Sequence, residues 1–216
     1  MSFEELSVSL INYYYEPTKT PAFDKFGVVS VISGNGKVVI TSAYEQNTHG
    51  SIYIKAQDSF GVWHSTYFDS SYSGTDNDEY GKSIAINYDG TIFAVSANNS
   101  MGTTDSGNSY GRVEIYKIEF DTDTTDPSKI IKKTLLTTFK GDYDDYRGQE
   151  DVLVGGVVVG KNYISNNLNY KFGLQISMND TGNKILINCK NRILAFSSNS
   201  SNKYDWDKPE PEVIIN

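Results

Sequence analysis

Apolar and polar residues alternate in short runs along most of the chain, and turn residues separate the runs. The segment YGKSIAINYDGTIFAVSA, from Tyr80 to Ala97, has two such runs around an Asp-Gly pair. Alternation with a period of two is typical of strands, and Asp-Gly tolerates the positive φ of a tight turn. The segment therefore predicts a β-hairpin.

The same hairpin pattern occurs three times. The segments FGVVSVISGNGKVVITSA (26–43) and FGLQISMNDTGNKILINC (172–189) align with residues 80–97 without a gap. In each segment an aromatic residue is followed by glycine, a second glycine comes nine residues later, and a small residue closes the segment. A repeat of this kind indicates one structural unit copied along the chain.

Each repeat is expected to contain four antiparallel strands. The first two strands are expected at Val28–Ile32 and Val38–Ser42, at Ser83–Asn87 and Ile92–Ser96, and at Leu174–Met178 and Lys184–Asn188. The third strands begin near Gly50, Gly111 and Asn191, and the fourth are placed around Val62–Phe68, Lys129–Phe139 and Glu212–Ile215. Four antiparallel strands per repeat are the anatomy of a propeller blade.

The predicted fold class is all-β, with antiparallel four-stranded blades in an incomplete or small β-propeller-like arrangement of about three repeats. The repeats are residues 23–78, 79–140 and 171–216, which we call repeats 1, 2 and 3. Residues 1–22 are expected to hold a strand that could complete a blade, and residues 141–170 an inserted β-hairpin. Propellers close a ring with about four to eight blades, so about three repeats form an open arc. This arc implies that the chain pairs with a second copy, that partner proteins cover its ends, or that the inserted hairpin forms a reduced fourth blade.

The repeats resemble FG-GAP-type β-propeller repeats, a family found in integrin α-subunits and in many bacterial, algal and viral surface proteins. The resemblance covers residues 23–216 and rests on the glycine turn, the small residue that closes the second strand, and the residues Phe26-Gly27, Tyr80-Gly81, Phe172-Gly173, Trp63 and Trp206. The GAP part of the family name has no match in this chain. Its place is taken by Ser42-Ala43-Tyr44, Ser96-Ala97-Asn98 and Asn188-Cys189-Lys190, without the Gly or the Pro.

Integrin-like repeats often carry a calcium loop between their first two strands. The corresponding turns of this chain offer Asn35, Asp89 and Asp180. Because Ca²⁺ takes six to eight oxygen ligands, calcium is not expected there. The run DTDTTD, with Asp121, Asp123 and Asp126, has a spacing that could wrap a cation but lacks the glycine of an EF-hand-like loop. We therefore expect a solvated acidic loop and no cofactor, with calcium at these three residues as the alternative.

Charge and hydropathy limit the partners. The 216 residues carry a net charge of −8, whereas proteins that bind nucleic acid need clustered Lys and Arg. No apolar run approaches the roughly 20 residues needed to cross a bilayer, and the segment MSFEELSVSLINYYYE has no signal-peptide pattern. Neither nucleic acid nor a membrane span is expected.

Candidate catalytic residues are few. The two histidines, His49 and His64, have no zinc-ligand spacing, and the single Cys189 stands where the other repeats have Ala43 and Ala97. A small buried side chain is therefore the interpretation for Cys189. The chain contains no G-x-S-x-G, P-loop or dinucleotide motif. The sequence accordingly predicts no catalytic residues and a protein that is not an enzyme.

These features favour a non-catalytic structural protein that works by protein–protein contact in a larger assembly. The expected partners are other proteins of the assembly or copies of the chain itself. A virion or particle surface is the expected location, and the alternatives are the cytoplasm or the cell exterior, reached by a non-classical route. A glycan-binding or adhesion module, using aromatic residues such as Tyr13, Tyr14 and Tyr15, is the alternative function, and a hydrolase is the last one.

Overall fold

The regular secondary structure that the computed structural model describes is almost all antiparallel β-sheet. It describes residues 25–70, 78–99, 111–121, 125, 130–141, 149–154, 157–163, 172–189, 192–199, 201–206 and 213–215. Within these residues the strands form three four-stranded sheets and one two-stranded sheet, and the helical structure is one 3-10 turn, η1 (Gln46–Thr48). The predicted all-β class with antiparallel four-stranded sheets is confirmed. No helix of the described residues has the length and apolarity required to span a membrane.

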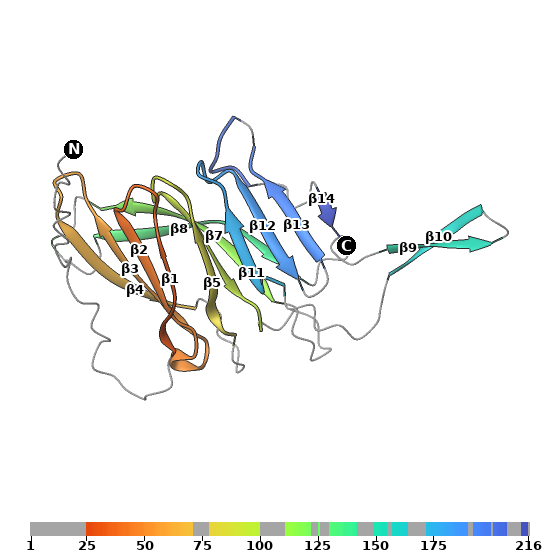
Figure 1. Ribbon diagram of the computed structural model, residues 1–216, viewed down its shortest axis with the longest axis horizontal. Coiled ribbons are helices and arrows are strands. Elements are labelled where there is room, and N and C mark those ends of the chain that lie inside the picture. The colour runs from red at the N-terminus through yellow and green to blue at the C-terminus, as the bar shows by residue number, and fades with distance from the viewer. Residues whose placement is uncertain are drawn as a thin grey trace, which may run out of the picture.

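The strands of each large sheet pair in chain order (Figure 1). Sheet 1 consists of β1 (Phe26–Ile32), β2 (Val38–Ala43), β3 (Ser51–Gln57) and β4 (Trp63–Asp69). Sheet 2 consists of β5 (Tyr80–Ile86), β6 (Ile92–Ala97), β7 (Arg112–Phe120) and β8 (Ile131–Lys140). Sheet 3 consists of β11 (Gln175–Met178), β12 (Lys184–Cys189), β13 (Arg192–Ser197) and β14 (Val213–Ile215).

Three further predictions concern the insertion, the N-terminal segment and the fourth strand of each repeat. A separate antiparallel hairpin forms from β9 (Gln149–Val154) and β10 (Val157–Tyr163), within the predicted insertion at 141–170. The strand expected in residues 1–22 lies outside the described residues. The fourth strand expected in each repeat is confirmed by β4, β8 and β14.

The aromatic–glycine pair marks an irregularity in the first strand of a repeat. The register of β1 against β2 shifts between Phe26 and Ser30, and that of β5 against β6 between Tyr80 and Ile84. Next to the aromatic residue, Gly27 and its repeat-2 counterpart have φ values of 83° and 94°. These values lie in the left-handed region that glycine tolerates best, as in a β-bulge. The recurrence of the pair thus reflects a backbone requirement.

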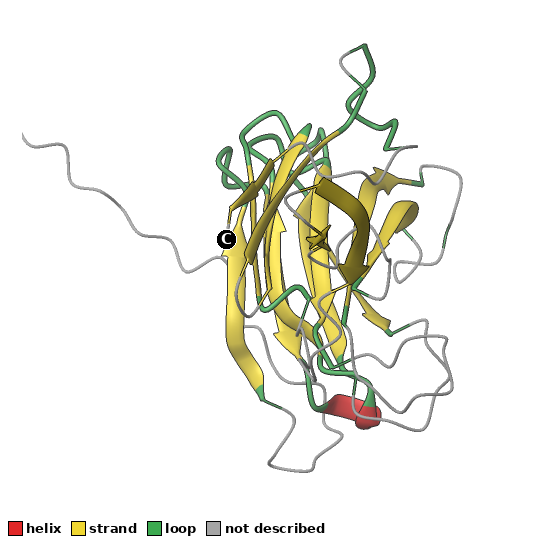
Figure 2. Ribbon diagram, turned by 90° about the vertical axis from the view of Figure 1, so that its right-hand side faces the viewer, coloured by secondary structure: helices red, strands yellow, loops and turns green. Residues whose placement is uncertain are grey.

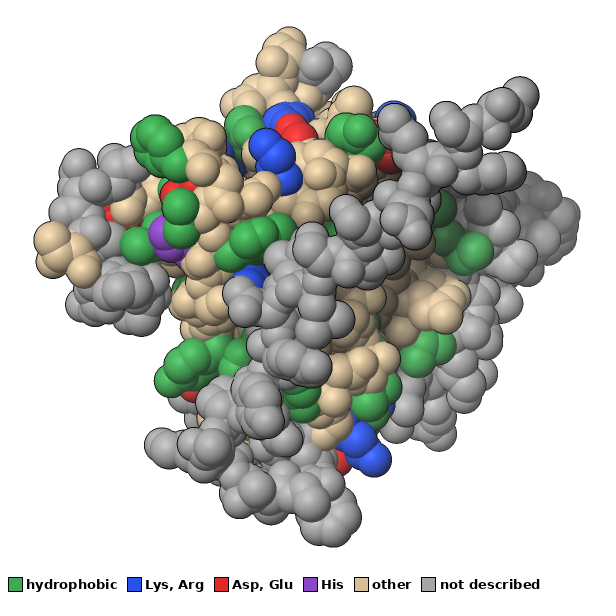
Figure 3. All heavy atoms as spheres, turned by 60° about the vertical axis from the view of Figure 1, so that its left-hand side comes forward, with side chains coloured by type: hydrophobic (Ala, Val, Ile, Leu, Met, Phe, Trp, Pro, Cys, Tyr) green, Lys and Arg blue, Asp and Glu red, His purple; other side chains and the backbone are tan. Residues whose placement is uncertain are grey.

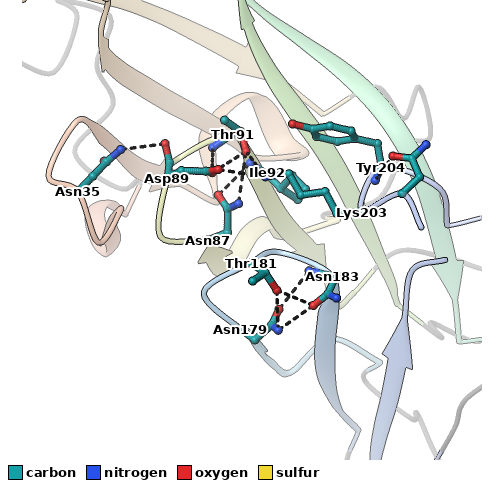
Figure 4. A network of polar contacts seen from close by, with 11 residues as sticks. Asn35, Asn87, Asp89, Thr91, Ile92, Asn179, Thr181, Asn183, Lys203 and Tyr204 are labelled. Atoms are coloured by element: carbon teal, nitrogen blue, oxygen red, sulfur yellow. Dashed lines mark hydrogen bonds and ion pairs between the residues drawn. The ribbon is translucent and has the colours of Figure 1, made fainter. Parts of the chain in front are cut away.

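The turn between the first two strands is closed by the same side-chain hydrogen bond in all three sheets. A side-chain oxygen of Ser33, Asn87 or Asn179 accepts a hydrogen bond of 3.0 Å from the backbone N–H five residues later. Two of these turns are drawn in Figure 4. Because Ser and Asn can bond to nearby backbone groups, they suit tight turns, and here they satisfy the N–H that opens the second strand.

The three sheets pack face to face in chain order, and the apolar cores lie between them (Figures 1 and 2). Between sheets 2 and 3, the ring of Phe139 lies 4.4 Å from that of Phe196 and 6.0 Å from that of Trp206. Between sheets 1 and 2, the ring of Phe93 stacks on Tyr116 at 5.3 Å. Sheet 2 is covered on both faces, and every residue of β6 is buried.

Candidate interaction surfaces

The two end faces of the row of sheets are the candidate interaction surfaces. We call the face of a sheet that points toward the preceding sheet its leading face, and the opposite one its trailing face. The leading face of sheet 1 and the trailing face of sheet 3 lack a described sheet packed on them. The first carries Gly27, Val28, Ser30, Ile32, Gly36 and Tyr67, and the second carries Asn179, Lys184, Leu186, Asn188 and Ile193.

Glycines in the first strand show how one sheet docks on the sheet before it. A Cβ built on Gly81 would lie 2.8 Å from the Cβ of Ser42, and one on Gly173 would lie 2.9 Å from the Cβ of Ser96. Such distances leave no room for a side chain, so glycine is required for the close approach. Gly27 has the same φ of 83° as Gly173, but no atom of the described chain lies within 4 Å of its Cβ position. The leading face of sheet 1 thus has the docking geometry without the neighbour.

The glycines in the turns between the first two strands show the same contrast between repeat 1 and the later repeats. A Cβ on Gly90 would lie 2.5 Å from Cγ2 of Val38, and one on Gly182 would lie 2.8 Å from Nδ2 of Asn87. In the first repeat, Gly36 also has a positive φ, of 71°, and no described atom lies within 4 Å of its Cβ position. Within the described chain, neither Gly27 nor Gly36 therefore has a neighbour at its Cβ position on the leading face.

Apolar side chains are exposed on the leading face of sheet 1. Val28 is 63% exposed, Ile32 62% and Tyr67 58%, whereas Ile86 and Met178, which correspond to Ile32, are partly buried against the cores. Figure 3 turns forward the side of the molecule that carries sheet 1, where hydrophobic side chains are visible at the surface among polar ones. Exposed apolar side chains that gather on one face mark interaction sites on soluble proteins.

The trailing face of sheet 3 exposes positions that are core elsewhere. Leu186 is 47% exposed and Ile193 36%. The corresponding residues of sheets 1 and 2 are fully buried, namely Ile40, Ala94, Ile52 and Val113. The exposure differs because the next sheet covers these positions in sheets 1 and 2.

Both end faces also carry polar residues where the inner interfaces are apolar. Ser30 on the leading face is exposed and takes the position of the buried Ile84 and Ile176. Lys184 on the trailing face is exposed and takes the position of Val38 and Ile92, which are buried. A mixture of polar and apolar residues is typical of interfaces between separately stable proteins.

A buried polar cluster connects sheets 1 and 2. The guanidinium of Arg112 lies 2.9 Å from Asp78 and 3.0 Å from Glu114, and it donates a hydrogen bond of 2.8 Å to Ser70. Burial lowers the pKa of Arg112, but the carboxylates outweigh this and raise it. Both ion pairs join Arg112 to carboxylates in or next to sheet 2, and the hydrogen bond to Ser70, which follows β4, is the link to sheet 1. Removal of one partner of such a buried ion pair typically costs about 3–5 kcal/mol.

Lys133 of β8 lies beside this cluster. Its Nζ donates a hydrogen bond of 3.3 Å to the hydroxyl of Tyr80 and lies 4.4 Å from the ring centre of Tyr116 and 4.8 Å from that of Phe68. Burial lowers the pKa of Lys133 to about 8. An amine with this pKa can act as a base or a nucleophile, but these contacts place it as a cation–π link between sheets.

The acidic residues considered for calcium are only partly described. Asp121 forms an ion pair of 2.5 Å with Lys132, and Asp123 and Asp126 lie outside the described residues. In the β5–β6 turn, Asp89 lies 3.0 Å from Nζ of Lys203 (Figure 4). Burial raises the pKa of Asp89, but hydrogen bonds from the turn and from this lysine lower it overall. Within the described residues no group of three or more His, Cys, Asp or Glu could hold a metal.

The remaining candidates from the sequence are the two histidines, the cysteine, one tryptophan and the tyrosine run, and those that the structure describes have structural contacts. Nε2 of His64 lies 2.8 Å from Asp58, and the carbonyl of His49 accepts a hydrogen bond from the N–H of Tyr80. Cys189 is buried, as predicted, and Trp206, one of the residues on which the resemblance rests, is a core residue. The run Tyr13, Tyr14 and Tyr15 lies outside the described residues.

Comparisons with known proteins assign neither a family nor a function to the chain. No protein-family model and no curated protein matches the chain. Among solved structures, the chain is similar to a functionally unknown protein from Desulfotomaculum acetoxidans DSM 771, with 18% sequence identity and a TM-score of 0.34. The match covers 79% of this chain and 37% of that one, so the chain spans well under half of that protein's length. At this TM-score the likeness does not bear on function.

Proposed function

We propose that the chain is a non-catalytic structural and interaction protein, built as an arc of FG-GAP-like propeller blades. Its work is protein–protein contact in a larger assembly, and a virion or particle surface is the proposed place. It needs no cofactor, binds no nucleic acid and has no membrane span. The alternative locations are the cytoplasm and the cell exterior.

One observation carries this proposal. Gly27 and Gly36 have the backbone conformations with which later repeats dock on a neighbouring sheet, yet both face empty space in the described chain. Ile32 and Leu186, at opposite ends, expose apolar surface whose equivalents are covered inside the molecule. Covering this surface would remove apolar area from water, which is the main favourable contribution to protein association.

The test is light scattering of the purified chain after size-exclusion chromatography over a range of concentrations. We expect the mass to rise above 24.1 kDa with concentration, and Ile32→Asp or Leu186→Asp to reduce that rise. Phe60→Asp is the control, because Phe60 is 88% exposed in the β3–β4 turn, outside the strands of sheet 1. A chain that stays monomeric at every concentration would contradict the proposal.

A second candidate, carbohydrate binding, is favoured by one feature of the leading face. The exposed ring of Tyr67 stacks on that of Tyr53 at 5.8 Å with an interplanar angle of 29°, and Tyr53 meets Phe26 edge-on at 5.1 Å. A flat aromatic surface of this kind can stack on a sugar ring. A glycan array compared between the native chain and Tyr67→Ala tests this. Loss of a reproducible signal in the variant would support it, and no signal at all would remove it.

A further inference from the structure

We propose that the leading face of sheet 1 in one copy of the chain docks on the trailing face of sheet 3 in a second copy, and that two copies close a ring. This pairing rests on the proposed interaction role and specifies its partner and its surfaces. The contact between copies repeats the way in which sheet 2 docks on sheet 1 and sheet 3 on sheet 2.

The inner interfaces define which residues meet. Gly81 packs against Ser42, and Gly173 packs against Ser96 in the same way. Asn188 of sheet 3 occupies the position of these two serines, and no described sheet lies beyond it. Gly27 of the second copy therefore takes its place against Asn188.

The apolar residues of the two end faces come together in this arrangement. Ile32 of one copy covers the region of Leu186 and Ile193 of the other, as the partly buried Ile86 packs on the trailing face of sheet 1. All three residues are at least 36% exposed in the single chain. Their burial supplies a hydrophobic driving force for association.

The number of sheets favours two copies over other numbers. The described residues of one chain form three four-stranded sheets, so those of two copies supply twice three, or six. Propeller rings close with about four to eight blades, whereas three copies would supply more than this. A head-to-tail contact used twice closes with twofold symmetry and leaves no end face open.

The polar residues on the end faces make this association reversible. Ser30, Lys184 and Asn188 allow both faces to exist in water, since they replace residues that are buried in the inner interfaces. The dimer should therefore form in a concentration-dependent way, with a mass of twice 24.1 kDa as its upper limit.

The closing experiment traps the contact with a disulfide in full-length protein. All variants carry Cys189→Ala, because Ala43 and Ala97 occupy the same position in the other repeats. Gly27→Cys is made in one protein and Asn188→Cys in another, and the two are oxidised separately and as a mixture. A covalent dimer is expected in the mixture and in neither protein alone.

An internal pair controls for strain at the glycine position. Ser42→Cys combined with Gly81→Cys places two thiols at the matching contact inside one chain, where the Cβ positions are 2.8 Å apart. This is shorter than the roughly 3.8 Å of a disulfide, so the strands must separate by about 1 Å. Formation of this bond within the chain shows that the contact can hold a disulfide.

The outcomes separate the pairing from the interaction role. If the internal control forms but the mixture gives no covalent dimer while light scattering still shows association, the head-to-tail pairing is wrong and the interaction role stands. Cross-linking of Gly27→Cys with itself, or a mass that grows past two copies, also overturns the pairing. A chain that is monomeric at every concentration overturns both.

Discussion

Gly27 and Gly173 differ in their surroundings and share their backbone conformation, which makes them a matched pair. Both have a φ of 83°, so an alanine at either position suffers the same backbone strain of about 1–2 kcal/mol. At Gly173 the new Cβ would also lie 2.8 Å from Cγ2 of Val113 and 2.9 Å from Cβ of Ser96. Overpacking of this kind adds about 1–3 kcal/mol.

We therefore expect Gly173→Ala to lower the free energy of unfolding by about 1–3 kcal/mol more than Gly27→Ala does. Urea denaturation at concentrations where the chain is monomeric measures both values. Equal losses would mean that close docking between sheets is not what requires glycine in the repeat.

Lys133 gives the molecule a pH-dependent stability. Its pKa is about 8 in the folded chain, whereas an unfolded lysine has a pKa of about 10.4. Between these values the unfolded state binds more protons, so the free energy of unfolding rises with pH. The carboxylates of Glu114 and Asp69 raise the pKa of Lys133 and Arg112 lowers it further, and burial outweighs them.

The test compares the native chain with Lys133→Met. From pH 7 to pH 10, we expect the native chain to gain about 1–3 kcal/mol of stability relative to the variant. Other titrating groups are common to both proteins and cancel in the difference, and burial keeps the pKa of Tyr80 well above this range. Parallel pH profiles in urea denaturation would show that burial does not shift this lysine.

At the scale of the element, the hairpin turn owes its shape to one side chain. Asn87 is buried, and its Oδ1 accepts the hydrogen bond of the fully buried N–H of Ile92. In repeat 1 the Oγ of Ser33 makes the same bond to Val38. A serine and an asparagine thus serve the same purpose, which explains why the three turns fold alike without identical sequences.

This equivalence predicts that Asn87→Ala destabilises the chain by about 1–3 kcal/mol, since a buried N–H loses its acceptor. Asn87→Ser should restore most of the loss, because serine is the residue of repeat 1. Asn179→Ala is the matched control. Its turn is exposed, so water replaces the lost bond and the cost should stay below about 1 kcal/mol. Thermal and urea unfolding of the three variants check this order, and a large loss in the control would contradict it.

For the whole molecule, the sequence predicts the local units better than the contacts between them. Alternation and the glycine turns place the strands of all three sheets within a few residues, because these signals depend on neighbouring positions. The pair formed by Arg112 and Asp78 joins residues 34 positions apart, and no local pattern marks it. The polar substitutions at Ser30 and Lys184 are visible in the aligned repeats, but only the packed sheets show that both lie on end faces.

The row of three sheets also predicts an uneven distribution of stability. Sheet 2 has a neighbouring sheet on each face, and all of β6 (Ile92–Ala97) is buried, whereas sheets 1 and 3 each have a described sheet packed on one face. In repeat architectures stability is approximately a sum over units and their nearest-neighbour interfaces, so the end units open first. We therefore expect native-state hydrogen exchange to be slowest in β6 and faster in β1 and β12. At concentrations where the chain pairs, exchange in β1 and β12 should slow while β6 changes little. Uniform protection, or fastest exchange in sheet 2, would contradict this order.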